Sequence, residues 1–251
     1  MQKVKTGRGM GLLVIVLAGS ALLQEANAGP WEVGGTGVDS KRKVKAEVAL
    51  RDSSGARVWA RPVLGYAHPV NERMSFEVSH GYGVIDRPGY RASGARDLDV
   101  KLKYQLARES PTGLAWLVEP KLGVPVGDDR KGIGRGRHAV ELPLRASRTV
   151  DATTYTGEVR YTHVLGGDHG QRLWGVGGLV EHVPGPAWVL GVDVFADTPV
   201  DRASRYHVRS NVAAKWRPTA AFEVQGLVGS TLTNRRGEEQ VSYKVVLEYK
   251  Y

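Results

Sequence analysis

The chain has 251 residues, a formal net charge of +9 and no cysteine, with 41% hydrophobic and 24% charged residues. The absence of cysteine excludes a small exported module that is held together by disulfides. No run of about 18 or more apolar residues is present, which excludes a membrane-spanning helix. The length allows one large domain or two small ones.

The first 28 residues have the organisation of an export signal. They begin with three cations, continue with an apolar run over residues 11–23, and end in Ala-Asn-Ala at residues 26–28. This order is typical of a signal peptide with its cleavage site, and the alternative is a buried helix of the folded domain. We predict a cleaved segment 1–28 and a single domain 29–251. Removing three cations and one glutamate lowers the net charge from +9 to +7.

Beyond residue 29 the dominant pattern is an alternation of apolar and polar residues, which is typical of β-strands. It is clearest over residues 98–106, where Leu, Val and Tyr alternate with charged residues. We predict twelve strands, with a glycine-rich one of uncertain register at 173–182. Their rows span residues 44–50, 58–66, 74–78, 98–106, 114–124, 138–146, 155–165, 173–182, 188–194, 206–216, 222–228 and 241–251.

The predicted connectors differ in length between the two ends of the strands. At one end they are short, for example residues 71–73 and 149–153, whereas two connectors at the other end span residues 86–96 and 127–137. Short turns at one end and long loops at the other are typical of bacterial outer-membrane barrels. An even number of strands then places both termini on the short-turn side, the periplasm of a Gram-negative bacterium.

We therefore predict an all-β fold: a closed antiparallel transmembrane β-barrel of about 12 strands. Alternation alone fits a soluble periplasmic β-sandwich equally well, because such a sheet also has one apolar face. The aromatic residues favour the barrel, since they gather near strand ends as interfacial girdles do. These residues are Tyr66, Tyr104, Tyr155, Trp188, Tyr206, Trp216, Tyr249 and Tyr251.

In a barrel the apolar row faces lipid and the charged row lines the lumen. Leu142 is expected near mid-membrane on the lipid face, and Arg61 is expected in the lumen. Nearly matched signs predict cross-strand pairs that narrow or plug the bore, and a slight surplus of cations favours anions if a water path exists. The proposed lumen-lining residues are Asp97, Asp99, Lys101, Lys103, Glu119, Lys121, Glu141, Arg145, Glu158, Arg160, Arg205, Arg209, Lys244 and Glu248.

Two stretches carry a family resemblance. "ARDLDVKLKYQL" at residues 95–106 and "PKLGVPVGDDRKGIGRG" at residues 120–136 resemble the outer-membrane β-barrel family named for the MetA pathway of phenol degradation, also described as a putative-transporter family. Val126 stands where that family usually has Thr, and Arg96 where it has Gly. The resemblance implies a barrel that passes small, often hydrophobic solutes across the outer membrane.

Several residues could serve an enzyme or ligand site, but each also fits a structural role. His163 could serve a lipase-type site, but it also fits an interfacial residue beside a girdle tyrosine. Asp97 and Asp99 could form an acid–base pair, but they share a face with lysines and fit a salt-bridged wall. The seven histidines have no metal-ligand spacing. The glycine-rich loop 132–137 lacks the helix of a phosphate site and is expected to be a flexible basic loop. We therefore expect no enzyme, cofactor, metal or nucleic acid.

The final stretch, "VSYKVVLEYKY", predicts a closing strand that pairs with the first strand and leaves no exposed edge. Tyr251 and Tyr249 are expected to be the signal for the barrel-assembly machinery, where Phe is more usual. The expected partners are this machinery, outer-membrane lipid and a small solute. The favoured function is a channel; the alternatives are a structural or surface-interaction barrel with a plugged lumen, and, third, an outer-membrane enzyme or the soluble sandwich.

Overall fold

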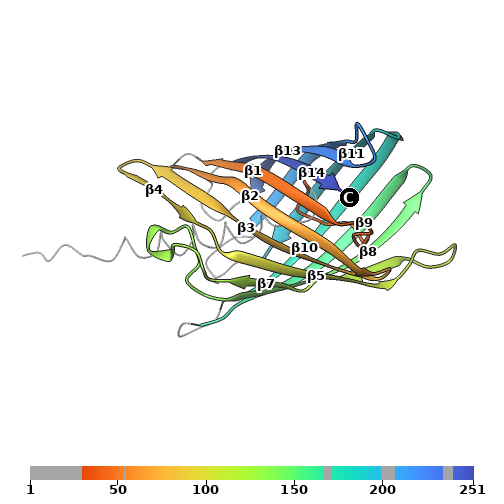
Figure 1. Cartoon of the computed structure of the whole chain (residues 1–251), viewed down its shortest axis with the longest axis horizontal. Helices are drawn as coiled ribbons and strands as arrows, with labels where there is room; N and C mark the ends of the chain where they lie inside the picture. Colours follow the sequence, from red (N-terminus) through yellow and green to blue (C-terminus); the bar gives the residue numbers. More distant parts are fainter. Residues whose placement is uncertain (1–29, 54, 167–170, 199–206, 234–239) are drawn as a thin grey trace, which may run out of the picture.

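The computed structural model describes residues 30–53, 55–166, 171–198, 207–233 and 240–251. These residues form strands almost throughout, with one 3-10 helix, η2 (Asp129–Lys131). The strands are β1 (Lys43–Ser53), β2 (Ala56–Asn71), β3 (Met74–Arg87), β4 (Tyr90–Ala95), β5 (Leu98–Ala107), β6 (Ala115–Val118), β7 (Lys121–Val124), β8 (Ala139–Val150), β9 (Thr153–Val164), β10 (Gln171–Gly185), β11 (Trp188–Asp197), β12 (His207–Trp216), β13 (Phe222–Thr233) and β14 (Gln240–Lys250) (Figure 1).

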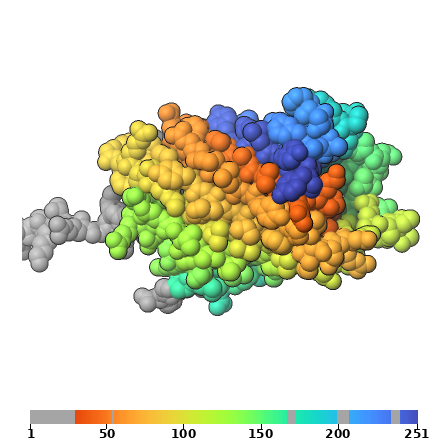
Figure 2. Space-filling model, in the orientation of Figure 1, coloured from red at the N-terminus to blue at the C-terminus, as the bar shows by residue number. Residues whose placement is uncertain are grey.

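The sheet closes on itself through the first and last strands. β1 pairs antiparallel with β14 from Lys43 opposite Lys250 to Ser53 opposite Gln240. Beyond the strand, the backbone N–H of Tyr251 donates to the carbonyl of Arg42 at 3.0 Å. The two strands lie side by side in the space-filling view, β14 in dark blue and β1 in orange (Figure 2). The predicted closing role of the terminal strand is therefore confirmed.

The barrel has twelve strand positions around its circumference, although the described residues form fourteen strands. β4 and β5 both pair with β3 and together occupy one position, and β6 and β7 both pair with β5 and β8 and together occupy the next. Pro120 lies in the break between β6 and β7, where a residue without an N–H cannot continue the ladder. The closed twelve-stranded antiparallel barrel predicted from the sequence is thus confirmed.

The predicted long loop over residues 86–96 is wrong. β3 continues to Arg87 and β4 returns from Tyr90, so that only two residues form the turn. Gly89 has φ +73°, a left-handed conformation that glycine adopts without steric cost. The Pro-Gly dipeptide here marks a tight hairpin instead of the start of an open loop.

The predicted apolar row over residues 58–66 does not stay on one face. The register of β2 shifts between Ala60 and Val63, so Ala60 is buried inside whereas Leu64 is 59% exposed on the outer face. Such a bulge adds residues to one strand and changes the face that follows. Arg61 lies in the bulge, is exposed, and places its guanidinium 4.9 Å from the Trp59 ring centre. The expectation that Arg61 lies in the lumen is therefore wrong.

Elsewhere the two faces of the wall follow the alternation. On β8, Leu142 and Leu144 are 45% and 40% exposed, whereas Glu141 and Arg145, which flank this stretch, are 4% and 2% exposed. The outside is thus apolar and the inside is charged, the reverse of a soluble sheet protein. No helix among the described residues is long and apolar enough to cross a membrane.

The connectors are sorted by length as predicted, apart from those after β1 and β3, which are two residues long at the long-loop end. Two residues separate β2 from β3, β8 from β9 and β10 from β11, all at the right-hand end in Figure 1. At the opposite end, fourteen residues (125–138) separate β7 from β8. The start of β1 and the end of β14 both lie at the short-turn end.

Candidate functional site in the barrel interior

Ion pairs between strands lie along the inner face of the wall. Glu77 of β3 accepts from Lys101 of the neighbouring β5 at 3.1 Å and forms a second pair with Lys45 of β1, across β2. Lys121 of β7 lies 3.2 Å from Glu141 of β8. Inward-facing positions on adjacent strands lie directly opposite one another, which brings these long side chains together.

Arg145 of β8 is the centre of the largest of these networks. Its guanidinium donates to Glu119, which lies between β6 and β7, at 3.2 Å and to Glu158 of β9 at 2.5 Å. All three side chains are 2% exposed or less. The wall of an open water-filled bore would be wetted, so burial this complete shows that the interior is filled at this level.

The structure also places other predicted lumen residues on the inner face. Lys103, Arg209 and Glu248 are buried on the inner face, and Lys244 is half-buried opposite Ala49. Arg209 pairs with Asp197 at 2.8 Å. Arg205 lies outside the described residues.

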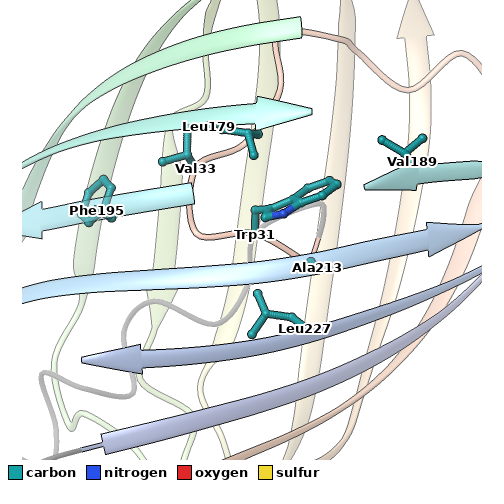
Figure 3. Close-up of a cluster of buried hydrophobic side chains, with 7 residues drawn as sticks. All are labelled: Trp31, Val33, Leu179, Val189, Phe195, Ala213 and Leu227. Atoms are coloured by element: carbon teal, nitrogen blue, oxygen red, sulfur yellow. The ribbon is translucent and has the colours of Figure 1, made fainter. Parts of the chain in front are cut away.

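The interior is filled by the chain itself, through residues 30–42, which we call the lumen segment. It precedes β1 and runs inside the barrel, where Trp31 is 2% and Val33 0% exposed. Figure 3 shows both side chains inside the curved wall, among Leu179, Val189, Phe195, Ala213 and Leu227. The lumen segment was not predicted from the sequence.

Asp193 of β11 binds the tip of the lumen segment through its backbone. The carboxylate accepts the N–H of Glu32 at 2.6 Å and the N–H of Val33 at 2.9 Å. The side-chain amide of Asn211 on β12 donates to the other oxygen at 2.6 Å. Both oxygens of this buried carboxylate therefore accept hydrogen bonds.

Arg160 of β9 makes a second contact with the same tip. Its guanidinium donates to the Glu32 carboxylate at 2.8 Å and to the Glu32 carbonyl at 2.9 Å. It also binds Glu158 of its own strand, from Nε to Oε1 at 2.8 Å. The guanidinium carbon lies 4.4 Å from the centre of the Phe195 ring, a cation–π arrangement.

Nearer to β1, the lumen segment is held by the opposite wall. Asp39 accepts from Lys103 at 3.1 Å and from the Ser75 hydroxyl at 3.1 Å. The Thr36 hydroxyl lies 2.5 Å from that of Ser147, and its carbonyl accepts from a wall glutamine. The lumen segment therefore crosses the bore from the wall of β3 and β5 to the wall of β9 to β12.

Glycines in the wall make room for the apolar side chains of the lumen segment. A Cβ atom on Gly191 would lie 2.6 Å from the Trp31 ring, and one on Gly177 would lie 2.5 Å from Val33. The Lys215 ammonium lies 4.2 Å from the Trp31 ring centre, on the face of the indole. The fit at this side of the bore thus depends on missing side chains.

The connector over residues 125–138 folds over the other end of the interior. Arg135 donates its backbone N–H to Asp97 at 2.9 Å and its guanidinium to Asp99 at 3.4 Å, and Ile133 is 4% exposed. The expected flexible basic loop is therefore wrong for this segment. Farther out, the hydrogen bond and charge of the Lys131 ammonium hold the pKa of the Asp128 carboxyl below its usual range.

The two enzyme candidates occupy structural positions. His163 lies on the outer face of β9 with its ring stacked on Tyr161, the two centres 6.3 Å apart. Asp97 and Asp99 bind the connector and Lys121. Among the residues that the structure describes, no three His, Asp or Glu side chains are grouped to hold a metal ion.

One signal in the sequence could have indicated the lumen segment. Trp31 and Val33 are apolar residues that follow the predicted cleavage site directly and precede the first strand. Three glycines at 34, 35 and 37 then allow close approach to a wall. A Cβ on Gly34 would lie 2.5 Å from the Arg145 guanidinium.

Comparisons with known proteins identify the fold. No protein-family model matches the chain, and no curated protein matches its sequence. The crystal structure of the COG4313 outer membrane channel from Pseudomonas putida F1 is similar, with a TM-score of 0.65 and 14% identity over 84% of this chain and 94% of that one. The translocator domain of the autotransporter NalP from Neisseria meningitidis has a TM-score of 0.58 and 10% identity, over 85% and 89%. The NanC porin has a TM-score of 0.56 and 11% identity, over 83% and 100%.

Proposed function

We propose that this chain is an outer-membrane channel for small solutes whose bore is closed by its own lumen segment. The single observation that carries the proposal is the charged interior: a wall of buried ionic side chains that is crossed by residues 30–42 of the same chain, which contact it through hydrogen bonds and ion pairs. The resemblance to the MetA-pathway barrel family and the similarity to an outer-membrane channel and a porin support the same assignment.

The outer face supports a membrane location. Large apolar side chains are exposed on the outer face of strands all around the barrel, for example Val44, Leu102, Leu142, Val192 and Val245. Exposed apolar surface of this extent is unfavourable in water and is favourable against lipid. Export through a cleaved segment 1–28, with both termini in the periplasm, completes the proposed topology.

The lumen segment distinguishes a closable channel from a purely structural barrel. A permanent filling can be built from the wall itself by pairing its charges or by apolar side chains. Here the bore is filled by the lumen segment, which continues into β1 at Lys43 and contacts the wall through hydrogen bonds, ion pairs and one apolar cluster. Moving it would open a path lined by Arg145, Arg160 and their partners.

The interior charges give the solute no strong sign preference. The inner-face cations named above contact carboxylates in shared networks, as in Lys101 with Glu77 and Lys121 with Glu141. The proposed solutes are therefore small molecules, including hydrophobic ones. No catalytic role is proposed, because His163, Asp97 and Asp99 have structural partners.

Planar-bilayer recording and liposome swelling test this proposal. The mature protein is compared with a variant that lacks residues 30–39 and keeps β1 intact. We expect small conductance for the mature protein and several-fold larger conductance and solute flux for the variant. If neither protein conducts ions or passes solutes while both are inserted, the barrel is structural and the channel assignment fails.

A further inference from the structure

A cluster of basic side chains lies on the β8–β10 side of the barrel, at the end away from the termini. His163 is opposite Val140 on one side and Arg172 on the other. His138 precedes β8 and its carbonyl accepts the N–H of Leu165 at 2.8 Å. Arg137 is exposed beside it and donates to the carbonyl of Gly166 at 3.0 Å. Four ionisable bases thus share one edge of the barrel.

An aromatic row lies directly beneath this cluster. Two residues farther from the edge, Tyr161 is opposite Trp174, and the two rings are 4.9 Å apart. Trp174 is 55% exposed on the outer face. Tyr and Trp in such rows sit at the boundary between hydrocarbon and headgroups. The cations one step beyond are therefore at headgroup depth.

The opposite side of the same edge has a different arrangement of charge. Asp52, Arg57, Asp86 and Arg91 lie opposite one another in turn on β1, β2, β3 and β4. Acid and base alternate, and Arg57 lies 3.1 Å from Asp52. By contrast, no ion pair joins Arg137 or Arg172 to a carboxylate among the described residues. Among the described residues of these two sides, bases without paired acids gather at β8–β10, whereas acids and bases alternate at β1–β4.

We propose that this surface, which we call the β8–β10 patch (Arg137, His138, His163 and Arg172), binds the phosphate groups of a phosphorylated glycolipid in the outer leaflet. Arginine recognises phosphate through paired hydrogen bonds, and basic groups at headgroup depth attract anionic lipids. The acyl chains of the lipid would lie along Trp174, Val176 and Leu142, which are all exposed on the outer face. This inference rests on the membrane location and orientation of the proposed function.

Native mass spectrometry of the detergent-solubilised protein tests the proposal. The probes are bisphosphorylated lipid A, the same lipid without phosphates, and inorganic phosphate. The test variant is Arg137→Gln/Arg172→Gln, and the matched control is Arg91→Gln at the same edge. We expect the phosphorylated lipid to bind the native protein and the control equally, and the double variant about tenfold more weakly, as for the loss of a charge-assisted hydrogen bond.

Three results would overturn the proposal. They are equal retention of the lipid without phosphates, equal weakening by Arg91→Gln, and undiminished binding by the double variant. Competition by inorganic phosphate alone at equal concentration would show a free-anion site in place of a lipid site. Heat-dependent gel mobility in phospholipid bilayers is measured in parallel. A protein that does not insert contradicts the proposed function, whereas an inserted protein without lipid selectivity contradicts this inference alone.

Discussion

Arg160 holds Glu32 by two separate contacts, one to the carboxylate at 2.8 Å and one to the backbone carbonyl at 2.9 Å. The second contact does not depend on the side chain at position 32. The tip of the lumen segment is thus fixed through its main chain, as it is by Asp193. Changes in the wall should therefore release the segment more effectively than changes in the segment itself.

The first prediction concerns Asp193→Ala. This change leaves the buried N–H groups of Glu32 and Val33 without their acceptor, and each unsatisfied donor costs about 1–3 kcal/mol. The lumen segment should leave the wall for part of the time. Because the chain has no cysteine, Val33→Cys provides a single probe for a membrane-impermeant maleimide. Labelling should be slow in the Val33→Cys protein and at least several-fold faster after Asp193→Ala.

The matched control for Asp193→Ala is Asp86→Ala, which removes an exposed outer-face carboxylate. It should leave the labelling rate unchanged. Equal labelling of all three proteins would show that Val33 is accessible without release and would contradict the role of Asp193.

The second prediction concerns the glycines of β10 and β11. Gly191→Ala places a Cβ 2.6 Å from the Trp31 ring, so the lumen segment must shift. Gly178→Ala adds the same atom on the outer face, where the nearest neighbour is a carbonyl 4.0 Å away. Single-channel recording should show a raised conductance for Gly191→Ala and native behaviour for Gly178→Ala. A native trace for both would mean that the segment adapts without moving.

The third prediction concerns Leu142→Arg on the outer face of β8. Leu142 is 45% exposed on the outer face, where it lies opposite Tyr161, and a cation that faces lipid costs up to about 2–4 kcal/mol, most at mid-depth. The variant is folded into bilayers and titrated with denaturant, and the folded fraction is read from heat-dependent gel mobility. The free energy of unfolding should be lower than that of the native protein. Leu142→Ala is the control for lost packing and should cost less. Equal stability of Leu142→Arg and Leu142→Ala would contradict the lipid-facing position.

The neighbouring residue Glu141 faces the interior, and its ion pair limits the substitutions that the barrel tolerates at this position. Its carboxylate is paired with Lys121 at 3.2 Å, and both side chains are 5% exposed. Glu141→Arg would place two cations together in a buried site, which is strongly destabilising. Glu141→Gln keeps a hydrogen-bond acceptor and should be the better tolerated of the two in the same denaturant assay.

The fourth prediction concerns the proposed assembly signal. Tyr251 is 56% exposed and stacks on Tyr249 at 6.1 Å, so its contribution to the folded barrel is small. Tyr251→Ala should therefore lower the amount of barrel in cell membranes several-fold and leave its stability in detergent unchanged. Tyr243→Ala, an exposed tyrosine of the same strand and row, is the control. Equal losses for both variants would assign the effect to the lipid face.

The wall of the barrel could be predicted from the sequence because its pattern is local. Residues two apart share a face, so the rows around Leu142 and Glu141 identify the two environments directly. The bulge at Arg61 and the hairpin at Gly89 were missed because each depends on one or two residues that interrupt the period. Register errors of this kind move every later residue of a strand to the other face.

The lumen segment could not be derived in the same way. The Glu32 and Val33 amides meet Asp193 across separations of 161 and 160 residues. Alternation in the wall shows which side chains point inward, but it does not show what they contact. The matched charges predicted a narrowed bore, and cross-strand ion pairs fill part of the interior. The lumen segment fills another part, and its sequence has no apolar–polar alternation that would indicate its position.

The position of the lumen segment imposes an order on biogenesis. Residues 30–42 are made before every strand, yet the docking partners of their tip, Asp193 on β11 and Arg160 on β9, are made more than a hundred residues later. The tip around Glu32 and Val33 therefore has no binding surface until these strands have been made. Because β1 follows it directly and also pairs with the last strand, the joining of the two chain ends and the closing of the bore are steps of a single final event.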